Sequence, residues 1–261
     1  MSTEESVQYE VRGRAAWITL ASPATRNALS APLIEALGAG LDRAIADAAV
    51  RVVVLTGSGP VFCAGADLKG GGAAVAQGGG GRNPFVTILK HMWDGPKPVV
   101  VAANGNAFGG GVGLIAAGDV AVAVEGATFA FSEVRVGVIP AMISVVVLPK
   151  LGVHHAMRLF LTGKRFDAQE ALAYGLVHRV VPAAALTAAV EEEIDAIAQG
   201  GPIAVAEAKR LVRTVSRLPM DDAFAYAETK IAELFASAEA AEGMAAFAQR
   251  RKPAWADLAA G

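Results

Sequence analysis

The chain has 261 residues, with 23 lysines and arginines against 25 aspartates and glutamates, which gives a formal net charge of −2 and an isoelectric point near 6.1. This balance offers no basic field for nucleic acid, so we exclude that class of partner. Hydrophobic residues make up 54% of the chain and the mean hydropathy is +0.43, so a sizeable buried core is expected.

Segments and residues that would mark other protein classes are missing. The stretch Met1–Ser6 is acidic and lacks the apolar core of a signal peptide, and no long apolar run is free of both glycine and charge. We therefore expect a cytoplasmic protein with no membrane partner. The single cysteine, Cys63, excludes an internal disulfide and is expected in the core. Four scattered histidines lack ligand spacing, so we expect no metal site.

Strands and a helix alternate in the first sixty residues. Two short alternating runs, 7–12 and 16–20, are separated by Gly13 and predict a hairpin. A helix with an apolar stripe follows, with Ser30 as its expected N-cap, and residues 51–56 then predict a buried strand. This order favours an α/β protein with a mainly parallel, helix-covered sheet.

A first glycine segment, TGSGPVFCAGADLK at 56–69, places small residues between a buried strand and a helix expected at Asp67. Its Gly57-Ser-Gly59 resembles part of a dinucleotide fingerprint, but Phe62 stands where the third glycine is needed. Residues 70–82 are almost all glycine and alanine, which predicts a mobile loop, either a lid or a passive insertion.

A second glycine segment, from Asn104 to Glu133, carries the strongest chemical signal. It follows a predicted buried strand at 98–103, and Gly109–Gly111 lead into an apolar helix. Glycines at a helix start leave N–H groups uncovered, and the helix dipole there favours negative charge, so we predict an anion or oxyanion site. Glu133 lies in an otherwise apolar run, where desolvation raises the pKa of a carboxyl group towards values useful for proton transfer. Two plainer interpretations stay open: glycines that only allow close helix packing, and a paired, structural Glu133.

The chain after Glu133 combines turns, helices and a short strand. Residues 137–143 predict an apolar turn, and a helix is expected from His154. Asp167 and Glu170 have the spacing of a capping box at the start of the next helix. Residues 175–182 predict the end of that helix and a short strand.

The last part of the chain is predicted to be helical from Ala184, with breaks at 200–202 and 218–219. The composition changes there from valine-rich to alanine- and glutamate-rich. We therefore predict a core over residues 1–200 and a C-terminal helical region over residues 201–261.

A series of sequence blocks carries a family resemblance through its order and spacing. The blocks are RNALS at 26–30, LTG at 55–57, FCAGADLK at 62–69, NG and GGG between 104 and 111, SEVRVGVIP at 132–140, TGKRFDAQEA at 162–171, GLV at 175–177, and EGM with FAQRRKPAW between 242 and 255. Together they resemble the enoyl-CoA hydratase/isomerase family, the crotonase fold, over essentially the whole chain.

The resemblance implies a crotonase-like spiral of ββα turns, a C-terminal helical trimerisation region, and assembly as a homotrimer or a dimer of trimers. It implies acyl-CoA thioester substrates, with no cofactor besides the CoA of the substrate. Glu133 is implied as the catalytic acid/base, with the N–H groups of Ala66 and Gly110 as an oxyanion hole. The positions implied to line CoA are Arg26, Ala28, Ala64, Ala66, Asp67, Lys69, Gly110, Phe247 and Arg250, the last two in some members from a neighbouring subunit. For Lys69 and Arg250, an ordinary solvated cation is the alternative.

One position departs from the family pattern. Typical hydratases of the family carry glutamate at the positions of both Gly113 and Glu133, and this sequence keeps only the second. Hydration uses a base for water and an acid for the α carbon, whereas moving a double bond between C3 and C2 needs a single base. We predict an enoyl-CoA hydratase-like enzyme with a single catalytic glutamate. The alternatives are a Δ3-Δ2-enoyl-CoA isomerase and a non-catalytic acyl-CoA-binding protein. The acyl group is not readable from the sequence.

Overall fold

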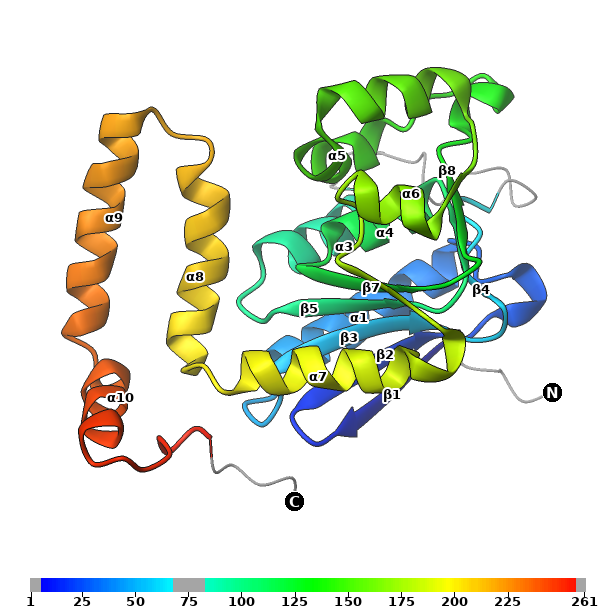
Figure 1. Ribbon diagram of the computed structural model, residues 1–261. Coiled ribbons are helices and arrows are strands. Elements are labelled where there is room, and N and C mark those ends of the chain that lie inside the picture. Colours follow the sequence, from blue (N-terminus) through cyan, green and yellow to red (C-terminus); the bar gives the residue numbers. More distant parts are fainter. Residues whose placement is uncertain (1–5, 68–82, 257–261) are drawn as a thin grey trace.

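A six-stranded sheet forms the centre of the computed structural model, which describes residues 6–67 and 83–256 (Figure 1). Its strand order is β1-β2-β3-β5-β7-β10; β1 and β2 pair antiparallel and the remaining neighbours pair parallel. These strands are β1 (Val7–Arg12), β2 (Ala15–Leu20), β3 (Val52–Gly57), β5 (Val99–Ala103), β7 (Val120–Val124) and β10 (Arg179–Val181). The predicted hairpin and the mainly parallel sheet are confirmed.

A second, four-stranded sheet in the order β4-β6-β8-β9 is built from much shorter strands. They are β4 (Val61–Cys63), β6 (Asn106–Phe108), β8 (Thr128–Ala130) and β9 (Phe166–Asp167). The chain visits the two sheets alternately, passing from β3 to β4, from β5 to β6 and from β7 to β8 before it reaches the next helix. This alternation is the expected spiral of ββα turns.

The helices among the strands bury one face each against the sheets or one another. They are α1 (Ala31–Ala46), α3 (Pro84–Asp94), α4 (Gly110–Ala117), α5 (Ala141–Thr162), α6 (Ala168–Ala173) and α7 (Leu186–Ala198). Ser30 is the N-cap residue of α1, although its side chain makes no capping hydrogen bond. The capping box of Asp167 and Glu170 is confirmed at the start of α6.

The helix predicted from His154 matches the part of α5 that follows Gly152, and α5 also contains an earlier helical part, from Ala141, that the sequence did not predict. Pro140 is its N-cap residue, and a glycine with a φ of +66°, Gly152, interrupts the helical backbone inside α5. A positive φ is readily adopted only by glycine, and α5 therefore consists of two helical parts separated by a break at Gly152. The apolar turn predicted over 137–143 ends at Pro140, so its last three residues were wrongly assigned and belong to α5.

Helix α5 also meets the length and composition of a membrane-spanning helix, with 22 residues and a mean hydropathy of 1.2. It is the only such helix in the described part of the chain. It packs against α4 and buries Ile143, Val146, Val147 and Leu151 in the core. Only 33% of its 18-residue apolar window is buried in the structure, and the cytoplasmic location stays a prediction.

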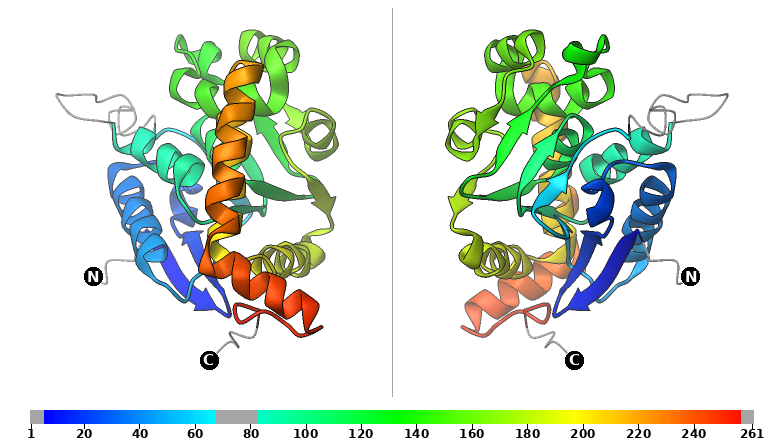
Figure 2. Two further views of the ribbon diagram at one scale, coloured as in Figure 1. Left: turned by 90° about the vertical axis from the view of Figure 1, so that its left-hand side faces the viewer. Right: turned by 90° about the vertical axis from the view of Figure 1, so that its right-hand side faces the viewer.

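The C-terminal helices α8 (Pro202–Val215), α9 (Met220–Phe235) and α10 (Ala238–Ala248) form an arm beside the sheets (Figures 1 and 2). The predicted breaks before α8 and α9 are confirmed. The Nζ of Lys209 on α8 lies 2.8 Å from Oδ2 of Asp119, and the guanidinium of Arg213 bonds the other carboxylate oxygen. This buried ion triad fixes the base of the arm. The division into domains at residue 200 stays a prediction.

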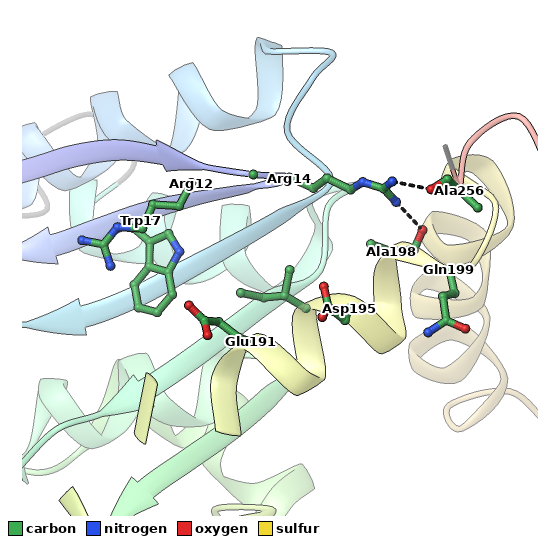
Figure 3. Close-up of a pocket in the computed structure, with 10 residues that line it drawn as sticks. Arg12, Arg14, Trp17, Glu191, Asp195, Ala198, Gln199 and Ala256 are labelled. Carbon is green, nitrogen blue, oxygen red and sulfur yellow. Dashed lines mark hydrogen bonds between the residues drawn. The ribbon is translucent and has the colours of Figure 1, made fainter. Parts of the chain in front are cut away.

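The segment after α10 returns to the N-terminal hairpin. Arg14, between β1 and β2, donates hydrogen bonds to the carbonyl oxygens of Ala198 and Ala256 (Figure 3). The ring nitrogen of Trp255 donates to the carbonyl of Gln199 at 3.0 Å. The pocket drawn in Figure 3, about 470 Å³, is lined by β1, β2, α7 and the C-terminal segment, and it contains none of the predicted site residues.

Candidate active site

Glu133 is the carboxylate around which the candidate site is built. It is the first residue of the 3-10 helix η2 (Glu133–Val136), shortly after the end of β8 in the second sheet. Its side chain is partly buried, and Oε2 is buried with no hydrogen-bond partner in the described part of the structure. Burial raises the pKa of Glu133 above 4.5, and a backbone hydrogen bond opposes that shift more weakly. The carboxyl group therefore binds a proton more readily than an exposed glutamate, which suits a group that takes up and returns a proton.

Gly109 allows this carboxylate to approach the start of α4. A Cβ atom at Gly109 would lie 2.9 Å from Oε1 of Glu133, and the residue has a φ of +48°. Both facts require glycine at this position. The N–H of Gly109 donates to the carbonyl of Ala130 at 2.9 Å, which joins the start of α4 to β8. This hydrogen bond thus links β8, which leads to Glu133, to the residue that precedes α4.

The N–H groups of Ala66 and Gly110 belong to adjacent backbone segments. The carbonyl of Gly65 accepts a hydrogen bond from Leu29 at 2.8 Å, and no cis peptide occurs in the described chain. Because the C=O and N–H of a trans peptide point in opposite directions, the N–H of Ala66 points away from Leu29. A Cβ at Gly65 would lie 3.6 Å from the nitrogen of Gly110, whose N–H belongs to the first turn of α4 and has no acceptor within that helix.

Leu29 and its neighbours hold these two segments in place. Leu29 forms an isolated β-bridge with Ala66, and a Cβ at Gly110 would lie only 2.5 Å from its Cδ1. Asn27 is fully buried; its Oδ1 accepts from the N–H of Ser22 at 2.9 Å and its Nδ2 donates to the carbonyl of Val61 at 2.8 Å. The sequence pattern did not single out Asn27 or Leu29, and only their place in the RNALS block pointed to them.

Two of the residues expected to line CoA, Arg26 and Ala64, share one pocket of about 460 Å³. Arg135 and Arg165, which the sequence did not single out, lie in the same lining, and no ion pair joins these three arginines to a carboxylate in the described chain. The rest of the lining consists of Val61, Asn106, Phe108, Ala130, Ser132 and Gly163. The pocket is therefore a positively charged hollow over the second sheet.

The other residues expected at CoA are distributed unevenly. Ala28, within the RNALS block, is buried, and Asp67 is half-buried. Lys69, the expected helix start after Asp67 and the glycine-rich stretch 70–82 lie outside the described residues.

Phe247 and Arg250 do not meet Glu133 within one chain. Phe247 is 89% exposed near the end of α10, and Arg250 follows it with a φ of +51°. Helix α10 lies at the opposite end of the molecule from β8 and η2 (Figures 1 and 2). A role for these two residues at the site therefore requires a second copy of the chain.

Gly113 lies one turn into α4, and its N–H donates to the carbonyl of the N-cap residue Gly109 at 3.1 Å. A Cβ at Gly113 would lie 2.2 Å from Cγ2 and 2.8 Å from Cβ of Ile143, in the first turn of α5. At the position where the family resemblance implies a second glutamate in typical hydratases, α4 therefore packs against the side chain of Ile143.

Metal and thiol chemistry find no support in the described residues. No group of three or more histidine, cysteine, aspartate or glutamate side chains there is arranged to hold a metal ion. Cys63 is fully buried at the end of β4, and burial raises the pKa of its thiol to about 12. It is a neutral core residue, as predicted.

Comparison with known proteins agrees with this geometry. The family model described as enoyl-CoA hydratase/isomerase matches residues 10–258. The chain belongs to this family. It is 36% identical over 260 residues to the carnitinyl-CoA dehydratase of Proteus mirabilis (strain HI4320), covering 96% of this chain and 98% of that one.

Solved structures of the family superpose closely on the whole chain. The enoyl-CoA hydratase of Shewanella pealeana has a TM-score of 0.90 at 30% identity, covering 97% of each chain. Pseudomonas aeruginosa AtuE has a TM-score of 0.89 at 35% identity, covering 97% of this chain and all of that one. The protein is thus a hydratase-like acyl-CoA enzyme with the crotonase fold.

Proposed function

We propose that this enzyme adds water to a 2-enoyl-CoA thioester, or removes it in the reverse direction, with Glu133 as its single acid/base. The observation that carries the proposal is the Glu133 carboxylate: its Oε2 is buried without a hydrogen-bond partner, its pKa is raised, and it packs against Gly109 at the start of α4. A buried carboxylate without a partner destabilises a fold, so a role in proton transfer explains why the site holds one.

In the proposed reaction, the N–H groups of Ala66 and Gly110 bind the thioester oxygen. Glu133 takes a proton from water as the water oxygen bonds to C3, and the electrons of the C2=C3 bond move to the thioester oxygen. The enolate then takes the proton back from Glu133 at C2, which restores the carbonyl and the carboxylate. Each oxyanion-hole donor contributes about 10²–10³-fold in comparable sites, or about 2.7–4 kcal/mol.

A second candidate function is Δ3-Δ2-enoyl-CoA isomerisation. It is favoured by the packing of Ile143 against Gly113, which leaves no room for a second carboxylate at position 113. Moving the double bond needs one base that takes a proton from C2 and returns it to C4, and Glu133 alone supplies that. Hydration with a single carboxylate requires the same group to act first as base and then as acid. Both reactions share the same enolate and the same two N–H donors.

The test compares three substrates with purified enzyme: crotonyl-CoA, a longer 2-enoyl-CoA and a 3-enoyl-CoA. Hydration removes the absorbance of the conjugated enoyl thioester, and isomerisation creates it from the 3-enoyl-CoA. We expect loss of absorbance with at least one 2-enoyl-CoA. Gain of absorbance without any hydration would select the isomerase. No turnover of any substrate, with thermal protection by CoA, would select a non-catalytic acyl-CoA-binding protein.

The phosphates of CoA are proposed to bind the pocket of Arg26, Arg135 and Arg165, with Ala28, Ala64, Asp67 and Lys69 along the rest of the CoA chain. Unpaired arginines match the charge and fork geometry of phosphate oxygens. Replacing Arg165 by alanine should raise KM for a CoA thioester about tenfold and leave the corresponding pantetheine thioester, which lacks those phosphates, unaffected. Arg12→Ala, at an exposed ion pair with Glu10, is the matched control.

Assembly as a homotrimer or a dimer of trimers is proposed from the arm. Large apolar side chains on α9 and α10 are more than half exposed in the single chain: Met220, Phe224, Ile231, Phe235, Met244 and Phe247. A face of this kind is normally covered by a partner. In such an assembly Phe247 and Arg250 can reach the CoA of a neighbouring copy. Light scattering that gave a monomer mass at micromolar concentration would contradict this proposal.

A further inference from the structure

The contact between Gly113 and Ile143 is one of the closest of any glycine in the described chain. A Cβ atom added at position 113 would lie 2.2 Å from one methyl of Ile143 and 2.8 Å from the Cβ of Ile143. Real Cβ atoms essentially never come this close to another carbon, so every residue except glycine is excluded while Ile143 keeps its place.

Ile143 is itself firmly held. It is 3% exposed, it lies in the first turn of α5, and α5 packs along α4. Close-packed cores do not yield by more than a few tenths of an ångström without cost, so the methyl group does not simply move aside. The space beside Gly113 on α4 is thus filled from α5.

We propose that Ile143 is a specificity-determining residue, because it fills the position of a second carboxylate and limits the site to a single proton-transferring group. This inference rests on the proposed function and deepens it. Gly109, the N-cap residue of α4, and Gly113 are joined by a backbone hydrogen bond of 3.1 Å; the first packs against the carboxylate of Glu133 and the second against the methyl of Ile143. The site is therefore confined to reactions that one carboxylate can carry out, and a glutamate introduced at 113 alone does not create the two-carboxylate site.

The distances determine which variant makes room. Ile143→Ala would keep the Cβ at 2.8 Å, whereas Ile143→Gly leaves only the Cα, which is 3.8 Å away and at ordinary contact distance. The experiment is therefore an exchange of side chains between the helices, Gly113→Glu together with Ile143→Gly. Each single variant is measured alongside it. Val145→Gly, at an exposed position of α5, controls for the effect of a glycine in that helix.

We expect the exchanged variant to hydrate a 2-enoyl-CoA at least about tenfold faster than Ile143→Gly alone, since one positioned acid/base group contributes about 10²–10⁴-fold. Its pH profile of kcat/KM should acquire a second ionisation, and its ratio of hydration to isomerisation should rise. Gly113→Glu alone should lose soluble protein or activity. A folded exchanged variant without any gain would overturn the proposal, and so would an equal gain from Gly113→Glu alone.

A smaller pair keeps the steric claim testable if the glutamate variant does not fold. Gly113→Ala should lower the melting temperature of the enzyme, and adding Ile143→Gly should restore part of that loss. Absence of any recovery would overturn the proposal. The proposed function is judged on the unmodified enzyme, so failure of that assay would leave this thermal pair interpretable on its own.

Discussion

The substitution Glu133→Gln separates catalysis from binding at this site. Glutamine keeps the shape of the side chain and removes its ability to exchange a proton. Glu133 is the carboxylate that packs against the start of α4, so turnover should fall by at least about 10²-fold, which corresponds to about 2.7 kcal/mol of transition-state stabilisation. The N–H groups of Ala66 and Gly110 are unchanged, so the dissociation constant for a CoA thioester should move less than about tenfold, or about 1.4 kcal/mol.

The measurement combines steady-state kinetics on the best 2-enoyl-CoA with calorimetric titration of CoA and a non-reactive acyl-CoA. Glu193→Gln is the matched control, because Glu193 is a partly buried glutamate on α7 that pairs with Arg179 away from the site. Near-full turnover in Glu133→Gln would refute the catalytic assignment. Lost thioester binding with intact fold would instead favour a structural role for this carboxylate.

Three further predictions follow from the electrostatics. The raised pKa of Glu133 means that kcat/KM for hydration should increase with pH through a value above 4.5, as the carboxylate base forms; a flat profile between pH 4.5 and 7 would contradict this. A raised carboxyl pKa also means that the folded state loses stability as the pH rises through the folded-state pKa of Glu133, because the buried group must then ionise. In thermal melts, Glu133→Gln should therefore be more stable than the parent by about 1 kcal/mol at pH 7 and equally stable at pH 4. Asp119→Ala leaves Lys209 and Arg213 buried without their carboxylate and should cost about 3–5 kcal/mol in urea unfolding, whereas Glu10→Ala should leave the urea midpoint unchanged.

Much of the architecture is encoded in local periodicity and could be predicted from it. The hairpin, the buried parallel strands, the stripe of α1 and the capping box at Asp167 depend on residues a few positions apart, so a short window contains the whole signal. The strands of the second sheet have only two or three residues each, which is too short for an alternating pattern. Their existence followed only from the family resemblance.

The candidate site divides in the same way. Glu133 and the glycines at the start of α4 were visible because an acid in an apolar run and a glycine cluster before a helix are local signals. Ile143 was not, because its importance lies in a contact with Gly113, thirty positions earlier in the chain. The same applies to Arg135 and Arg165, which share a pocket with Arg26 only after folding.

The alternating visits to the two sheets bear on how the protein emerges from the ribosome. In the first sheet each parallel strand from β3 onward pairs with a neighbour that was synthesised earlier, so β3, β5, β7 and β10 extend that sheet in chain order. In the second sheet β4 waits for its neighbour β6, after which β8 adds to β6 in the same direction. The spiral can therefore grow in the direction of synthesis, with each turn adding to an edge that already exists. The hairpin residue Arg14 differs from the strands, because its acceptors at Ala198 and Ala256 are synthesised more than 180 positions later.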